Sequence, residues 1–459
     1  MLVRVIGMFV VILSVAFLAN AARAGELNND EIAELSLQLF AAQGDAKTPI
    51  VEKLSALNDK SLIATFVLAM RWTGSDVRVA NALSNLTGEK IATWHDAYEW
   101  QERHPEIVPH VTYQEVKLRF LGNTDARFLN LFKSPYGLRE NMRIRLEEIV
   151  WGGTRFDDIP SLDAATMIAA EQADYLLEQD LVFGVEINGD ARAYPLRIMG
   201  WHEMVNDVIG GVPVALAYCT LCGSGILFET QPEGRDSPFI FGSSGLLYRS
   251  NKLMFDRGTQ SLWNQYTGTP VVGPLTNSGT TLKVRPITIT SWEQWRRVNP
   301  TTTVLSLNTG YSRNYDSGVT YSEYFNSPDL MFPVALNESG PLQSKDYVFG
   351  IRGFASSKAW PLAVFKNTPL INDSVGAQSL VLIGDAATRT VRAYERSLDE
   401  KFEFNHDNTI SSNEGDWVLQ EDFLVSADGT QRRARLPGHI SYWFAWDNYF
   451  GVKSELYNP

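Results

Sequence analysis

The chain has 459 residues, a net charge of −13 and only two cysteines. Its composition, 44% hydrophobic, 11% aromatic and 20% charged, excludes a chain that is disordered over most of its length. No block of Lys and Arg offsets the acidic balance, which argues against a nucleic-acid or anionic-lipid surface and favours metal ions, small molecules or proteins as partners. Two cysteines are also too few for a disulfide-stapled secreted scaffold.

The N-terminus has the pattern of a secretory signal peptide. Arg4 precedes an apolar run from about Val5 to Leu18, and Ala22-Arg23-Ala24 forms a cleavage site, so we predict removal of residues 1–24. The alternative is an uncleaved membrane anchor. No later segment approaches the roughly 20 apolar residues of a membrane helix. We therefore expect a periplasmic or secreted protein with no membrane insertion after signal cleavage.

Residues 25–146 have the pattern of a helical domain. The stretches "DEIAELSLQLFAAQ" and "PIVEKLSALNDKSLIATFVLAMRW" repeat apolar residues at three- and four-residue spacing, and Pro49 suits the start of a helix. Another helix, "WHDAYEWQERHPEI", is expected to end before Pro105.

Residues 147–325 have the pattern of a β-rich unit. "LVFGVEINGDARAYPL" predicts a hairpin about Asn188-Gly189, and "EMVNDVIGGVPVALAYC" predicts another about Gly210-Gly211. Short apolar runs separated by turns follow, and "SWEQWRRVNP" predicts one helix.

A shift of 166 positions aligns residues 180–210 with residues 346–376, and ten of the 31 positions are identical. Chance would give roughly two. The Trp-x-x-Trp of "WEQWRRVNPTTTVL" also recurs in "WFAWDNYFGVKSEL". We therefore predict an α+β chain in which the helical domain precedes two related barrel- or sandwich-like β-rich units, the second and degenerate one at residues 326–459, from an internal duplication.

Comparison of the two copies also distinguishes residues expected to be structural from residues expected to be functional. Asn206-Asp207 recurs in the second copy and is expected to be architectural, whereas Cys219, Cys222 and His202 correspond to Asp385, Thr388 and Thr368. Only the first copy is therefore expected to carry a chemical site.

Three interpretations of the Cys-x-x-Cys are open. A structural disulfide would close so small a ring that it removes only roughly 2 kcal/mol of chain entropy. Thiol-disulfide chemistry usually places such a pair at the start of a helix, but the residues after Cys222 predict another strand. The third interpretation is metal binding through soft thiolate ligands.

The metal interpretation is the leading one from sequence. If "WHEMVND" is a strand, His202 and Met204 lie on one face and complete a set with Cys219 and Cys222 that suits copper, or zinc without the thioether. An open coordination position would permit metal-dependent oxidoreductase chemistry, although the sequence does not decide whether the protein is an enzyme. For Met204 alone, core packing is the competing explanation, and for His202 a structural hydrogen-bonded role.

Other residues are candidates for substrate binding or for support of the site: Glu203, Tyr218, Asp256 and Arg257. An Asp-Arg pair is usually structural, but it can also orient an anionic substrate. The alternatives to a metal protein are a periplasmic thiol-disulfide protein and a non-catalytic binding module. A binding module would need many of the 12 Trp and 17 Tyr to be exposed.

Several of these stretches together resemble the domain-of-unknown-function family DUF3179. They are "DARAYPLRIMGWHEMVNDVIGGVPVALAYCTLCGSGILFE", "FGSSGLLYRSNKLMFDRGTQSLWNQYTGTPVVGPL" and "SWEQWRRVNPTTTVLS", with "YEWQERHPEI" upstream. The resemblance covers about Leu181 to Ser306. Members of the family usually have proline between the cysteines, where this chain has Thr220. The resemblance implies an exported or membrane-associated prokaryotic protein and supplies no catalytic residues.

Overall fold

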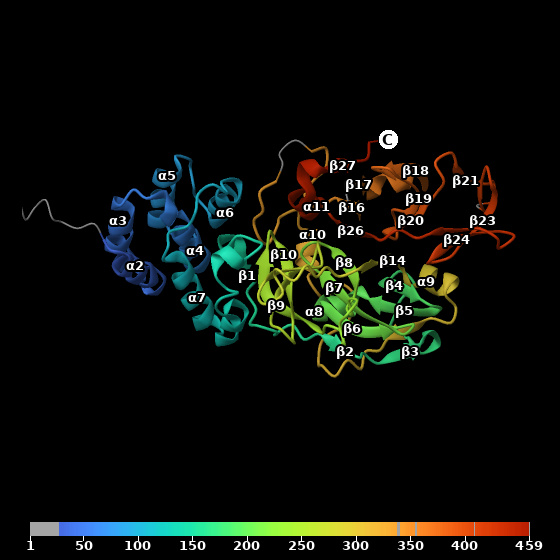
Figure 1. Ribbon diagram of the computed structural model, residues 1–459, viewed down its shortest axis with the longest axis horizontal. Helices are drawn as coiled ribbons and strands as arrows, with labels where there is room; N and C mark the ends of the chain where they lie inside the picture. Colours follow the sequence, from blue (N-terminus) through green and yellow to red (C-terminus); the bar gives the residue numbers. More distant parts are fainter. Residues whose placement is uncertain (1–26, 337–339, 354–355, 408, 459) are drawn as a thin grey trace, which may run out of the picture. The chain divides into compact units, whose positions relative to one another are not determined.

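The computed structural model describes residues 27–336, 340–353, 356–407 and 409–458, so the predicted signal peptide lies outside the described residues (Figure 1). The chain divides into two compact units. One contains its described residues up to Ala97 together with His104–Phe120, and the other contains Tyr98–Arg103 and the chain from Leu121 onward. Helices dominate the N-terminal region and β-sheets the remainder, which confirms an α+β fold.

The N-terminal helices follow the apolar periodicity of the sequence. They are α2 (Asn29–Ala41), η1 (Gly44–Lys47), α3 (Thr48–Ala56), η2 (Lys60–Leu62), α4 (Ile63–Thr73), α5 (Val77–Thr87), α6 (Trp94–Arg103) and α7 (Tyr113–Thr124). Asn28 and Glu31 form a capping box at the start of α2, and Pro49 lies in the first turn of α3 as predicted. Among the described residues, no helix has both the length and the apolar character required to cross a membrane.

Three five-stranded sheets form the first part of the β-rich unit. Their orders are β1-β9-β10-β11-β12, β13-β8-β7-β6-β2 and β14-β4-β5-β15-β3. The strands are β1 (Ile149–Trp151), β2 (Leu162–Asp163), β3 (Met167–Ala169), β4 (Leu181–Ile187), β5 (Asp190–Pro195), β6 (Met204–Ile209), β7 (Val212–Cys219), β8 (Ser224–Glu229), β9 (Phe241–Tyr248), β10 (Asn251–Asp256), β11 (Leu262–Asn264), β12 (Thr269–Val272), β13 (Val284–Arg285), β14 (Thr288–Ser291) and β15 (Thr303–Leu305). The helical segments are η3 (Ala126–Phe132), η4 (Arg139–Asn141), η5 (Leu146–Glu148), η6 (Ala170–Gln172), α8 (Leu196–His202) and α9 (Trp292–Val298).

Three more sheets follow, in the orders β26-β16-β17-β27, β18-β19-β20 and β21-β22-β23-β24-β25. Their strands are β16 (Tyr347–Arg352), β17 (Ser357–Pro361), β18 (Leu370–Val375), β19 (Gln378–Asp385), β20 (Thr390–Glu395), β21 (Phe402–Phe404), β22 (Ile410–Ser412), β23 (Gly415–Leu419), β24 (Phe423–Ser426), β25 (Arg432–Ala434), β26 (Gly438–Tyr442) and β27 (Ser454–Leu456). The helical segments are α10 (Ser322–Asn326), η7 (Leu362–Lys366), α11 (Trp443–Phe450) and η8 (Gly451–Lys453). No sheet closes on itself among the described residues, so a barrel is not found.

The two parts of the β-rich unit use the same local arrangement. In β14-β4-β5-β15 and in β26-β16-β17-β27, the last strand runs parallel to its neighbour while the other pairs are antiparallel. A tryptophan from the following helix packs on a central glycine in each sheet. A Cβ added to Gly184 would lie 2.2 Å from Trp295, and one added to Gly350 would lie 2.0 Å from Trp446. Only glycine leaves room for the indole at either position.

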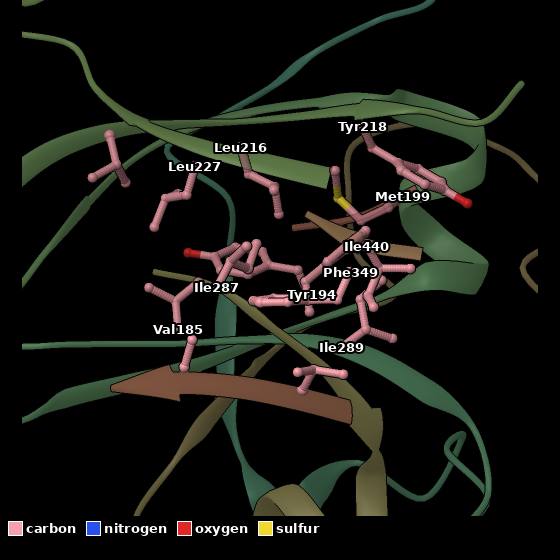
Figure 2. Close-up of a cluster of buried hydrophobic side chains, with 14 of the residues drawn as sticks. Val185, Tyr194, Met199, Leu216, Tyr218, Leu227, Ile287, Ile289, Phe349 and Ile440 are labelled. Atoms are coloured by element: carbon pink, nitrogen blue, oxygen red, sulfur yellow. The ribbon is translucent and has the colours of Figure 1, made fainter. Parts of the chain in front are cut away.

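One hydrophobic core joins both parts. Figure 2 shows Val185 and Tyr194 in the same cluster as Phe349 and Ile440, which come from the second part. Because all four side chains are buried together, the two parts share this core, and each part also has smaller apolar clusters of its own.

The two predicted hairpins are present, but one strand prediction is wrong. Ile187 pairs with Asp190 across one turn, and Ile209 pairs with Val212 across the other. The expected strand "WHEMVND" is a helix as far as His202, the last residue of α8. The chain turns at Glu203, and the strand begins only at Met204. His202 and Met204 therefore do not share a strand face.

Candidate thiol site

The two cysteines lie at the tip of a β-hairpin. Cys219 ends β7 and pairs with Ser224 at the start of β8, and the backbone N–H of Cys222 donates to the Cys219 carbonyl at 3.2 Å. Gly223 completes the turn in the left-handed region (φ +59°), where glycine carries no steric penalty. The strand predicted after Cys222 is confirmed, so the pair does not stand at the start of a helix that follows it in the chain.

Both cysteines are free of a disulfide, buried and in contact with each other. Their Sγ atoms are 2.9 Å apart, and the exposed fractions are 2% for Cys219 and 0% for Cys222. The side-chain amide of Asn251 donates to the Cys222 sulfur at 3.2 Å, and the Cys222 sulfur lies 3.4 Å from the Ser250 carbonyl oxygen. The pair therefore stands in one defined arrangement, fixed by β10 and the turn before it.

The two sulfurs differ in acidity. Burial raises the pKa of Cys219, but hydrogen bonds from the Cys222 thiol and from the Lys252 backbone N–H outweigh burial and hold that pKa below its usual value. Burial and the neighbouring Cys219 raise the pKa of Cys222 well above its usual value. Cys219 is thus the more acidic thiol of the pair, and Cys222 is the one that donates a hydrogen bond to it.

Glu203 is the centre of a buried polar network beside the thiols. Its carboxylate accepts a 3.1 Å hydrogen bond from the Lys252 ammonium and one of 3.1 Å from the Thr220 hydroxyl, and Ser243 and Tyr321 donate at 3.3 and 3.5 Å. The side chains of Glu203 and Lys252 are only 9% and 5% exposed. Removal of one partner would leave an uncompensated buried charge, which is costly.

The backbone around this network adopts rare conformations. Glu203 caps α8 with φ +56°, and the turn between β9 and β10 places both Arg249 (φ +51°) and Ser250 (φ +58°) in the left-handed region. Non-glycine residues carry a strain cost there, and such residues cluster at functional sites. The strained turn carries the Ser250 carbonyl, whose oxygen lies 3.4 Å from the Cys222 sulfur.

A cavity of about 50 Å³ adjoins one of the two sulfur residues. Of the two cysteines, Cys219 lines this inner cavity, together with Glu203, Thr220, Lys252 and Tyr321. A space of this size takes the reacting end of a small molecule and no more. Cys219 is therefore the cysteine that a small reactant meets first, in keeping with its lower pKa.

Both ring nitrogens of His202 lie within hydrogen-bond distance of other groups in the fold. Its Nδ1 lies 2.8 Å from the Pro160 carbonyl and its Nε2 lies 2.6 Å from the Tyr315 hydroxyl. Burial lowers the pKa of His202. Met204 packs in an apolar cluster with Ala217 and other core side chains. In the part of the chain that the structure describes, no group of three or more His, Cys, Asp and Glu residues is arranged to hold a metal ion.

The other candidate residues have structural partners. Asp256 is fully buried and accepts hydrogen bonds from Thr259 and from the Trp263 indole at 2.9 Å. Arg257 forms ion pairs with Asp157 and Asp163. Tyr218 is a member of the shared hydrophobic core, where its ring contacts Phe183 edge to face.

Sequence reasoning missed Lys252, Thr220, Ser243 and Tyr321 as members of the site. A lysine within the apolar run "NKLMFD" was a usable signal, because lysine is almost never fully buried without a partner. Tyr321 comes from the connection between β15 and β16, and nothing in its local sequence relates it to Glu203. Only the tertiary fold brings these residues to the thiols.

The family model described as "Protein of unknown function (DUF3179)" matches residues 156–452. The chain belongs to this family. The match confirms the resemblance seen in the sequence and extends it over both parts of the β-rich unit. No curated protein and no solved structure matches the chain.

Proposed function

We propose that the protein is a thiol-disulfide redox protein in which Cys219 attacks and Cys222 resolves. The observation that carries the proposal is the asymmetry of the pair: the sulfurs are 2.9 Å apart, Cys219 lines a cavity and has the lower pKa, and Cys222 is fully buried with the higher pKa. An attacking thiolate and an inaccessible resolving thiol need these respective properties.

The co-reactant in this proposal is a low-molecular-weight disulfide, RSSR. The Cys219 thiolate attacks one sulfur, so that a protein–substrate S–S bond forms, the substrate S–S bond breaks and one RS⁻ leaves. The Cys222 thiol then loses its proton to water, and its sulfur attacks Cys219 and expels the second RS⁻. The two cysteines lose two electrons and RSSR gains them. A thiol reductant of the same class restores the pair by the reverse steps.

The second part of the β-rich unit provides an internal comparison, and we propose that the two parts arose by internal duplication. Its support is the ten shared identities and the recurring sheet order. The hairpin equivalent to the thiol hairpin joins β19 and β20 and is closed by a 2.8 Å hydrogen bond from Thr388 to Asp385. Because this hairpin forms without cysteines, a purely structural role for Cys219 and Cys222 is the weaker explanation.

Copper or zinc binding through Cys219, Cys222, His202 and Met204 stays a prediction, as do export and the periplasmic location. The positions of the His202 nitrogens against Pro160 and Tyr315 favour thiol chemistry over that ligand set. The binding-module alternative has little support, because among the 12 tryptophans, all within the described residues, only Trp72 is exposed.

Trapping of the mixed disulfide tests the proposed roles. Reduced Cys222→Ser protein, treated with an excess of oxidised glutathione, should accumulate a stable glutathione adduct on Cys219, whereas Cys219→Ser should react far more slowly. The wild-type protein should pass to an internal disulfide. Equal trapping in both variants would contradict the assigned roles. About one equivalent of copper or zinc in the purified protein, lost in Cys219→Ser, would instead support the metal prediction.

A further inference from the structure

A second cavity lies next to the inner one. This outer cavity has a volume of about 350 Å³ and shares three lining residues, Thr154, Ile159 and Tyr321, with the inner cavity. The Tyr321 hydroxyl is 3.5 Å from the Glu203 carboxylate, so this side chain stands between the outer cavity and the polar network. A molecule that occupies the outer cavity therefore has Tyr321 between itself and Cys219.

The outer cavity contains a cation without an acidic partner. Arg313 has no carboxylate within 4.0 Å among the described residues, and its guanidinium lies 5.8 Å from the centre of the Trp201 ring. The other charged lining residue is Asp158. The cavity therefore offers one cation, Arg313, that is free to pair with an anionic group, and this cation lies beside the Trp201 ring.

A buried polar atom in the same cavity also lacks a partner. The Thr320 hydroxyl oxygen is buried and has no hydrogen bond within the described part of the chain. A buried hydroxyl without a partner costs free energy, and a ligand that supplies a donor or acceptor recovers it. Arg313, Trp201 and Thr320 thus offer a charge, an apolar face and a hydrogen-bonding group to one small molecule.

We infer that the outer cavity is the substrate-recognition site and that it selects small carboxylate-bearing disulfides and thiols. The carboxylate pairs with Arg313, the carbon skeleton packs on Trp201, and the sulfur end passes Tyr321 to meet Cys219. This inference rests on the proposed thiol function, and it adds a charge preference that the thiol chemistry alone does not require. Arg313 and Trp201 are positioning residues, since neither meets the reacting sulfur.

Alkylation by a matched pair of reagents tests the preference without redox turnover. Iodoacetate and iodoacetamide are nearly equal in size and both place a CH₂ group on the Cys219 sulfur as iodide leaves, but only iodoacetate is an anion. The rate with iodoacetate divided by the rate with iodoacetamide gives a ratio at Cys219, measured by peptide mass spectrometry at low ionic strength. This ratio should fall about threefold or more in Arg313→Gln. Arg313→Lys should retain most of the ratio, and Asp158→Asn should keep or raise it.

Other outcomes have defined meanings. An unchanged ratio in Arg313→Gln would overturn the inference, as would a ratio in the wild-type protein that does not decrease with added salt. Tyr321→Ala should increase the rate at which both reagents alkylate Cys219, because removal of the Tyr321 ring joins the two cavities. The proposed function fails separately, in the glutathione experiment, if no adduct and no internal disulfide form. The alkylation ratio remains measurable in that case.

Discussion

Replacement of Cys222 by alanine should make Cys219 less acidic and less reactive. The Cys222 thiol is 2.9 Å from the Cys219 sulfur and is the strongest hydrogen-bond donor to it, while the Lys252 backbone N–H remains in the variant. A hydrogen bond to a charged group contributes about 1.5–3 kcal/mol. Its loss corresponds to roughly ten- to a hundredfold less thiolate at a pH below the pKa of the thiol.

The expected rate change is smaller than the change in thiolate population. A thiolate of higher pKa is intrinsically more nucleophilic, with a Brønsted coefficient of about 0.4–0.5, so roughly half of the loss is recovered. Alkylation of Cys219 by iodoacetamide near pH 6 should therefore slow by about three- to tenfold in Cys222→Ala. The midpoint of its pH profile should move to higher pH.

Mass spectrometry of the Cys219 peptide measures this rate even when a second thiol is present. Cys222→Ser is the matched control, because its hydroxyl can still donate to the Cys219 sulfur and should preserve much of the low pKa. If Cys222→Ala alkylates at the wild-type rate with the same midpoint, the hydrogen bond between the sulfurs is not what activates Cys219, and the reasoning fails.

Three further predictions concern stability. Glu203→Gln should lower the free energy of unfolding by about 3–5 kcal/mol, because Lys252 is left buried without a counter-charge. In urea denaturation, the double variant Glu203→Gln/Lys252→Met should recover much of the lost stability. Equal losses in the single and double variants would refute this prediction. Burial raises the pKa of Glu421, but two arginines and a threonine hold it at about 2, below its ordinary 4.5. The unfolded state therefore binds more protons between these pH values, so stability should fall as pH drops from 4.5 to 2, and Glu421→Gln should flatten that dependence. Gly184→Ala and Gly350→Ala should each cost about 1–3 kcal/mol, since the added methyl overlaps an indole ring, and a neutral result at either site would contradict that packing.

Much of the fold could be predicted from local sequence. Asn188-Gly189 and Gly210-Gly211 favour tight hairpin turns regardless of distant contacts, and both turns are present. The helix that ends at His202 was missed because an apolar stretch of seven residues fits either a helix or a strand by periodicity. Whether this stretch forms a helix or a strand depends on packing in the shared core, where Ile198 is buried among side chains from both parts of the unit.

The candidate site could be predicted in its two thiols and in Glu203, but not in the other residues of the polar network. Cys219 and Cys222 are three positions apart in the sequence, and their chemistry follows from residue type alone. Lys252 and Tyr321 reach the pair through strand pairing and a long connection, so no local pattern relates them to it. The predicted placement of His202 and Met204 on one face depended on a strand geometry that the chain does not adopt, and the His202 nitrogens lie beside Pro160 and Tyr315.

The reduction potential of the Cys219–Cys222 pair tests the central claim most directly. The full-length protein is equilibrated in glutathione buffers of graded ratio and quenched by acid, and the free thiols are then alkylated and the peptide is weighed. The account predicts a reversible two-electron transition between a dithiol and an internal disulfide that follows a single potential. Thiols that stay reduced across the whole series, or an internal disulfide that no buffer reduces, would contradict it.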